Sequence, residues 1–278
     1  MEQQDGGLLK AIEDFSANVS PLDFYVIFQH WDLFLKGVGN TISLVVLALV
    51  IGGALSVPLA VARANKTPIA NQAIWAYVYV FRGTPLLVQT YLIYYGLGQF
   101  EAIRESLLWP FLREAWWCAL IAFVLNTAAY TTEIFRGVIE STPWGEVEAA
   151  KASGMSPMTR TRRIILPSAF RRALPMYSNE VIFMLHGSVV ASTVTIVDIL
   201  GAGRELNAKY YLAYEGFIAA AVIYMILVFG ISKGFKAWEW KWHAHLRPRD
   251  VEGDPEAAAK GAKKPASEPT EIKPALIR

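Results

Sequence analysis

Polar and ionisable side chains recur at helical spacing inside an apolar segment near the middle of the chain. Asn126, Tyr130 and Glu133 follow one another by four and three residues, so a helix would carry them on one face. An acidic residue at a helix centre costs roughly 2.5–3.5 kcal/mol to insert into a bilayer, and such residues usually face a bundle interior or a cavity. A carboxylate in that position could bind a cationic or ammonium group.

A second apolar segment carries a comparable set of polar residues. Asn179 and His186 share a helical face with Phe183, and Glu180 lies about 100° around the helix from Asn179. Together with the first set, these residues are predicted to line a polar arc, in which the carboxylates could bind a cationic group.

The competing interpretation of the same residues is structural. Glu133 lies three residues before Arg136, at a spacing that supports an ion pair on one helix. Glu180 could pair with Arg172 or cap the start of its helix, and His186 could form a hydrogen bond inside a bundle. Spacing alone leaves both interpretations open.

The sequence gives little support for catalysis, metal binding, a disulfide or nucleic-acid binding. No nucleophile–base pair and no metal-ligand cluster is recognisable, so we expect no catalytic residue and no metal site. His243 and His245 are too weak a pair to change this. Cys118 is the single cysteine, so no disulfide can form within the chain. The net charge of +2 gives no reason to expect a nucleic-acid partner.

The apolar residues are clustered, which indicates a membrane protein. Of 278 residues 54% are hydrophobic and only 18% are charged, against about 25% in soluble domains. A spanning helix needs about 20 mostly apolar residues. The predicted fold class is an all-α membrane protein with five transmembrane helices in contact with the lipid bilayer. The predicted spans are 38–62, 83–100, 115–134, 175–197 and 216–231, and 68–81 is expected either to lie at the interface or to extend the second span.

Basic residues alternate between the connecting segments and so predict the orientation. The segment before the first span holds Lys10 and Lys36 against six acids, whereas 135–172 holds seven basic residues. Because basic loops stay in the cytoplasm, we expect the N-terminus outside and the C-terminus inside.

Four regions can be assigned from these spans. Residues 1–36 are expected to be an extracytoplasmic N-terminal segment, and 37–233 a five-helix transmembrane domain with a cytoplasmic loop at 138–172. Tryptophans alternate with charged residues in 234–251, as is typical of an interfacial segment. Residues 252–278 are rich in Ala, Lys, Pro and Glu and are predicted to be a disordered cytoplasmic tail.

The cytoplasmic loop carries the start and stop signals of two short helices. Thr142 is a plausible N-cap with Pro143 as the first helical residue, and Gly154 is a plausible C-terminal stop. Ser156 and Pro157 would start a second helix that Pro167 ends. A short surface helix of this kind is free to dock into a partner.

The detailed sequence of the loop resembles a known family. Glu148-Ala149-Ala150, three residues, Gly154, nine residues and then Ile164-x-Leu166-Pro167 match the EAA motif of permease subunits of type I ATP-binding-cassette importers. Residues 81–89 and 129–137 are similar to the polar amino-acid branch of that family. The resemblance covers roughly residues 35–245.

The resemblance implies that this loop is a coupling helix seated in a groove of a separate cytoplasmic ATPase. The residues it assigns to coupling are Glu148, Ala149, Ala150, Ser153, Gly154 and Met155. No G-x-x-x-x-G-K-[ST] phosphate loop occurs in the sequence, so the chain is not expected to be an enzyme or to hold a cofactor. ATP and Mg would be bound by the partner ATPase.

The same resemblance implies further partners and a location. They are a second homologous permease subunit or a copy of this chain, a homodimer of ATP-binding subunits and an extracytoplasmic substrate-binding protein, all at a bacterial inner membrane. Residues 177–186 are similar to the M subunit of histidine/lysine/arginine/ornithine permeases, which implies basic amino acids as cargo. Opine permeases and other polar amino-acid permeases remain open, as does an ATP-independent secondary transporter.

Overall fold

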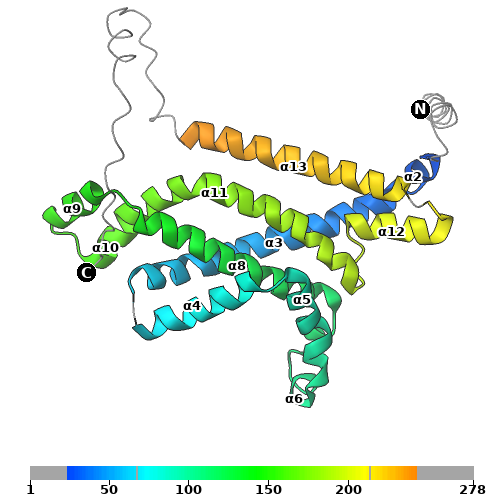
Figure 1. Cartoon of the computed structure of the whole chain (residues 1–278), viewed down its shortest axis with the longest axis horizontal. Coiled ribbons are helices and arrows are strands. Elements are labelled where there is room, and N and C mark those ends of the chain that lie inside the picture. Colours follow the sequence, from blue (N-terminus) through cyan, green and yellow to red (C-terminus); the bar gives the residue numbers. More distant parts are fainter. Residues whose placement is uncertain (1–23, 67, 213, 243–278) are drawn as a thin grey trace, which may run out of the picture.

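A computed structural model describes residues 24–66, 68–212 and 214–242, and the secondary structure of these residues is entirely helical. The long helices run side by side along the longest axis of the molecule, with short helices at both ends (Figure 1). The predicted C-terminal tail, the last residues of the predicted interfacial segment and most of the predicted N-terminal segment lie outside the described residues.

Three of the described helices are long and apolar enough to cross a membrane. They are α3 (Trp31–Ala64), α8 (Ala115–Glu140) and α13 (Glu215–Trp242). Each contains one of the predicted spans and is longer than it, so the first, third and fifth predicted spans are confirmed as long apolar helices.

A fourth candidate is bent. The continuous helical stretch Pro157–Val194 joins α12 (Ile199–Tyr210) at an angle of 41°. The stretch consists of α10 (Pro157–Arg160), a π-helical turn η3 (Thr161–Ile165), α11 (Leu166–Gly187) and a 3₁₀ segment η4 (Ser188–Val194).

The expectation that Pro167 ends a short helix is wrong. Pro167 occupies the first turn of α11, directly after the π turn η3. Proline lacks the N–H that an α-helix would use there, and a π turn shifts the hydrogen-bonding pattern locally, so the helix passes through. The continuous helix that contains the predicted fourth span therefore begins inside the predicted cytoplasmic loop 138–172, eighteen residues before the predicted start at residue 175.

The second predicted span also differs from the structure. Residues 68–83 form a helix of their own, α4 (Pro68–Gly83), and the chain breaks before α5 (Leu86–Tyr91). Pro85 is extended, with ψ of 138°. Thr84 precedes this proline and is therefore disfavoured in the α conformation, which explains why the helix stops here. After α5 the chain continues through a π turn η1 (Leu92–Gly96) and a 3₁₀ turn η2 (Leu97–Gln99). The total of five spans stays a prediction.

Four short helices complete the described chain. They are α2 (Tyr25–Gln29), α6 (Glu101–Arg104), α7 (Trp109–Leu112) and α9 (Trp144–Ala152).

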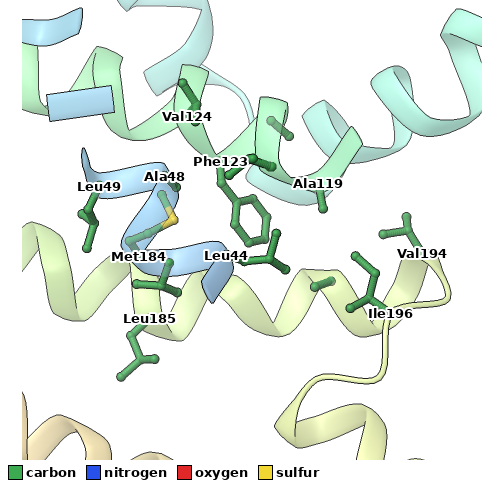
Figure 2. Packing of buried hydrophobic residues seen from close by; sticks show 14 of the residues in the cluster. Leu44, Ala48, Leu49, Ala119, Phe123, Val124, Met184, Leu185, Val194 and Ile196 are labelled. Atoms are coloured by element: carbon green, nitrogen blue, oxygen red, sulfur yellow. The ribbon is translucent and has the colours of Figure 1, made fainter. Parts of the chain in front are cut away.

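The largest buried cluster joins α3, α8 and α11 (Figure 2). Phe123 of α8 is fully buried beside Leu44 of α3, with Met184 of α11 in the same cluster. Gly52 permits the close approach of α3 to α8, because a Cβ at this position would lie 2.3 Å from Cγ2 of Thr127. This packing holds the polar faces of α8 and α11 near one another.

The molecule has two distinct ends. The short helices α9 and α10 lie at one end, and α12 and α2 lie at the other (Figure 1). At the α12 end, Asn40 Nδ2 of α3 donates a hydrogen bond to Val197 O at 2.9 Å, and Asp198 Oδ1 accepts from the Gly201 N–H at 2.6 Å. These bonds cap the start of α12 and attach it to α3.

Candidate functional site

A cavity of about 560 Å³ lies between the α4–α5 break, α8 and α11. Its lining combines a guanidinium, a carboxylate, an amide, a phenol and apolar side chains. The lining residues are Arg82, Gly83, Thr84, Pro85, Leu86, Asn126, Tyr130, Glu180, Phe183, Met184 and Gly187. Both helices that carried the predicted polar sets contribute to it.

Glu180 is the acidic residue of this cavity. It is only 6% exposed, and Thr127 Oγ1 donates a hydrogen bond to its Oε1 at 3.1 Å. The predicted alternative partner, Arg172, lies elsewhere and donates to Ser168 Oγ, Val138 O and Thr142 Oγ1 instead. The expected Glu180–Arg172 pair is therefore absent from the described residues.

Arg82 supplies the opposite charge and was not predicted from the sequence. It lies in the last turn of α4, and its guanidinium carbon is 5.1 Å from the centre of the Tyr130 ring. The Tyr130 hydroxyl donates to the Arg82 carbonyl at 3.4 Å. A signal was present in the sequence, because Arg82 is a charged residue between two apolar runs, directly before the Thr84-Pro85 break.

Asn126 holds the break between α4 and α5 in place. Its Nδ2 donates to Gln89 Oε1 at 3.1 Å and to Phe81 O at 3.3 Å. Gln89 in turn donates to Phe81 O at 2.7 Å and to Thr84 Oγ1 at 2.8 Å. The amide network satisfies backbone carbonyls that the break leaves without helical partners, so Asn126 lines the cavity and also shapes it.

Glu133 does not reach this cavity. It forms ion pairs with Arg63 of α3 and with Arg136, the latter at 2.9 Å. Arg136 also pairs with Glu140 at 2.7 Å. The predicted Glu133–Arg136 pair is thus present, and Arg63 was the partner that sequence spacing could not indicate.

Asn179 and His186, the remaining predicted residues, do not line this cavity either. Asn179 is exposed and is not among the lining residues of the cavity. His186 lines a separate hollow against α13, together with Val189 and Tyr224. The predicted continuous polar arc is therefore divided, since only Asn126, Tyr130 and Glu180 of the six residues share one cavity with Phe183.

The predicted coupling loop forms a helix with a defined end. Gly154 has φ of +73°, the left-handed conformation that favours glycine. The Gly154 N–H donates to Lys151 O at 2.9 Å and the Met155 N–H donates to Ala150 O at 3.2 Å, so the last carbonyls of α9 are satisfied. The expected stop at Gly154 is confirmed.

The two faces of α9 differ in solvent exposure. Ala150 is buried at 4% exposure, whereas Glu148 and Ala149 are exposed. Ser153 is exposed and its Oγ donates to Ala149 O at 2.9 Å. The helix therefore presents a short side with small residues to its surroundings while Ala150 anchors the opposite side.

The start of α9 differs from the expected cap. Thr142 does not cap α9; its Oγ1 donates to Ile139 O at 2.7 Å, in the last turn of α8, and accepts from Arg172 Nη2 at 2.9 Å. Pro143 precedes the helix, whose first residue is Trp144. The Ser156–Pro157 start of the next helix is confirmed, with Ser156 Oγ accepting from the Thr159 N–H.

Arg172 ties this loop to two long helices. From α11 its guanidinium reaches Val138 O and Thr142 Oγ1, both at 2.9 Å, at the end of α8. These bonds hold the first half of α11 against the end of α8 and against Thr142, which lies two residues before α9.

The comparison with known families agrees with this arrangement. Residues 48–235 match the family described as "Binding-protein-dependent transport system inner membrane component". The chain is 42% identical over 238 residues to the nopaline transport system permease protein NocM of Agrobacterium fabrum, covering 85% of this chain and 99% of the relative. It is 44% identical over 213 residues to the histidine/lysine/arginine/ornithine transport system permease protein HisM of Escherichia coli, covering 76% and 90%.

Solved structures show the same fold. A crystal structure of an amino acid ABC transporter with histidines superposes with a TM-score of 0.71 at 30% identity, covering 80% of this chain and 100% of that one. The inward-facing MetNI methionine ABC transporter superposes with a TM-score of 0.62 at 19% identity, covering 77% and 98%. The second likeness concerns the fold alone.

Proposed function

Because this chain belongs to the family of inner-membrane components of binding-protein-dependent transport systems, and is a permease subunit of an amino-acid ABC importer, we propose that its cargo is a basic amino acid. The similarity to HisM, whose name states histidine, lysine, arginine and ornithine, supports this cargo. The similarity to NocM favours an opine as the second candidate. Opines also carry amino-acid groups, so both candidates need an anionic and a cationic partner.

The pair Arg82 and Glu180 in one cavity carries the proposal. A guanidinium recognises a carboxylate in a bidentate manner, and a buried carboxylate recognises an ammonium or guanidinium group. Arg82 would bind the cargo carboxylate, and Glu180 would bind its cationic side chain or its α-ammonium group. Tyr130 and Asn126 would orient the cargo, while Phe183 supplies an apolar wall. For Glu133, Asn179 and His186, contact with the cargo stays a prediction from the sequence alone.

Energy would come from partner subunits. Two copies of an ATP-binding subunit would hold ATP and Mg, and this chain would contribute no ATPase site of its own. A second permease subunit would complete the path, and an extracytoplasmic binding protein would deliver the cargo at a bacterial inner membrane. ATP-driven closure of the ATPases would move α9, and the Arg172 bonds would pass that movement to α8 and α11.

Removing the charge of Glu180 tests the binding role. In the complete importer reconstituted in proteoliposomes, Glu180→Gln should raise the KM for a basic amino acid about tenfold or more, because charged hydrogen bonds contribute roughly 1.5–3 kcal/mol. The control is Glu205→Gln, an exposed acid on α12 outside the cavity. Uptake of labelled arginine at a series of concentrations provides the measurement.

Three results would count against this assignment. An unchanged KM and rate in Glu180→Gln would remove Glu180 from the cargo site. Competition of arginine uptake by nopaline but not by lysine or histidine would favour the opine alternative. Uptake that continues without the ATP-binding subunit would favour an ATP-independent transporter.

A further inference from the structure

A second and larger cavity, of about 780 Å³, lies at the end of the molecule that carries α9 and α10. The cavity that Arg82 and Glu180 line is called the cargo cavity. The second cavity is separate from it, since the two share no lining residue. The end of α3 and the turn after it contribute Val61 and Lys66, the end of α8 contributes Ile139, and the coupling segment contributes Lys151 and Arg160.

Arg160 is the unusual residue of this cavity. Its side chain lines the space although the residue is only 7% exposed, and its Nε has no hydrogen-bond partner among the described residues. None of the ion pairs found in the described part of the chain includes it. A buried cation without a partner is costly, so an anion placed in the cavity would stabilise it.

The other charges of the cavity do not neutralise Arg160. Lys66 and Lys151 add two further cations, with Lys151 lying 5.4 Å from the Trp144 ring centre. The acidic residue of the lining is Glu140, which already pairs with Arg136 at 2.7 Å. The cavity therefore presents a net positive surface.

The shape and remaining lining favour an amphiphilic anion over a small one. Val61, Ile139 and Ile165 give the cavity an apolar side opposite its basic residues. Its volume is far larger than one phosphate or carboxylate needs, and lies within the range of roughly 300–1,000 Å³ for organic ligands. The cavity also adjoins the end of α3, a membrane-crossing candidate, where lipid headgroups would lie.

We propose that this cavity binds the phosphate headgroup of an anionic phospholipid from the cytoplasmic leaflet. Basic pockets between membrane helices on the cytoplasmic side are known to hold such headgroups. Arg160 would bind the phosphate, Lys66 and Lys151 would border it, and the apolar side would accommodate the glycerol and the first acyl carbons. The inference rests on the proposed orientation, with α9 inside. A lipid in this place would link α3 to the coupling segment.

Retention of lipid by the purified importer tests the proposal. The complete complex in detergent would be mixed with equal amounts of phosphatidylglycerol and phosphatidylcholine, and native mass spectrometry would count the lipids retained. We expect phosphatidylglycerol to be retained in preference, and Arg160→Gln to weaken its retention about fivefold, since one basic residue near an anionic membrane contributes about 1 kcal/mol. Arg160→Lys should retain most of it.

Two further variants keep the test independent of folding. Arg162→Gln is the matched control, because Arg162 is exposed on the same segment and does not line the cavity. Lys66→Gln removes an exposed cation of the lining and should also weaken retention. Arginine uptake measured after reconstituting the same purified complexes in proteoliposomes separates a failure of this proposal from a failure of the proposed transport function.

Several outcomes would overturn the proposal. Equal retention of both lipids, or equal loss in Arg160→Gln and Arg162→Gln, would remove the site. Displacement of phosphatidylglycerol by millimolar inorganic phosphate would identify a free anion as the ligand. Retention by the isolated subunit but not by the complex would show that a side chain of the ATPase occupies the cavity.

Discussion

At the scale of single residues, the two acids in the middle of the sequence separate into different roles. Glu180 is buried in a cavity beside Arg82, with Thr127 as its hydrogen-bond donor. Glu133 is held between Arg63 and Arg136, with side-chain exposures of 10% for Arg63 and 15% for Glu133. The first arrangement leaves the Glu180 carboxyl at the wall of a cavity, whereas the second joins α3 to α8.

Glu180→Gln and Glu133→Gln are therefore expected to act on different properties: the first on the KM for arginine, the second on the stability of the protein. Glu133→Gln should lower the stability of the protein by about 3 kcal/mol, because it leaves Arg63 partly buried without a counter-charge. The KM for arginine should stay near the wild-type value. Thermal unfolding in detergent, followed by tryptophan fluorescence, measures the first effect and uptake measures the second.

The control for the stability effect of Glu133→Gln is Glu114→Gln, which breaks an exposed ion pair. Glu114 pairs with Arg113 at 3.6 Å, and both side chains are about 60% exposed, so the expected loss of stability is about 0–1 kcal/mol. If Glu133→Gln unfolded at the wild-type temperature and raised the KM instead, Glu133 would belong to the cargo path and the structural role would be wrong.

At the scale of elements, two irregular places in the helices position the functional parts. The break at Thr84-Pro85 directs Arg82 and the start of α5 toward α8, and Asn126 fastens it. The π turn η3 lets the helix continue from α10 into α11 past Pro167, so the end of the predicted coupling loop and a long helix form one continuous piece. The turn at Gly154 then sets α9 at an angle to that piece.

The turn at Gly154 can be tested by substitution. Gly154→Val should abolish most arginine-stimulated ATP hydrolysis and uptake, because a β-branched residue is strongly disfavoured at φ of +73° and would displace α9. Gly145→Val is the matched control, since Gly145 is helical, exposed and has nothing within 4 Å of its Cβ position. ATPase and uptake assays on proteoliposomes provide the measurement.

The two variants distinguish a coupling role from general damage. Gly145→Val should favour the helix by a few tenths of a kcal/mol, because glycine has a lower helix propensity than valine, and it should keep most of the activity. Wild-type uptake in Gly154→Val would show that the angle at this turn is not needed for coupling. Equal loss of activity in both variants would point to general damage of α9.

At the scale of the whole molecule, the predicted coupling segment and the cavity lined by Glu180 lie at different places along the long helices. The coupling segment and the proposed lipid cavity lie at one end, α12 lies at the other, and the cargo cavity is bordered by helices that run between them (Figure 1). The start of α3 and the end of α13 also point toward opposite ends of the molecule (Figure 1). This arrangement suits a chain whose described N-terminal and C-terminal helices end on different sides of a bilayer.

The orientation is predicted by the basic residues and can be measured directly. In a Cys118→Ala background, Lys209→Cys on α12 should react with a membrane-impermeant maleimide in intact cells. Ser156→Cys, beside α10, should react only after the cells are permeabilised. Both positions are exposed in the structure. The reverse pattern would invert the predicted orientation.

The features that depend on local chemistry can be predicted from the sequence. Apolar runs indicated α3, α8 and α13, because every backbone group inside a bilayer must find its partner within a helix. Gly154 indicated the end of α9, since few other residues adopt positive φ, and Ser156 with Pro157 indicated the next helix start. The EAA spacing indicated the family to which the chain belongs.

The contacts between residues far apart in the sequence depend on how the helices pack and could not be predicted. Arg63 reaches Glu133 across 70 positions of the chain, and Gln89 reaches Asn126 across 37. Helical spacing placed Asn126, Tyr130 and Glu133 on one face, yet the packing of α3 and α4 against different parts of α8 sent the first two to the cavity and the third to an ion pair. Periodicity specifies the face of a helix, whereas the neighbour that covers each turn depends on the whole arrangement of helices.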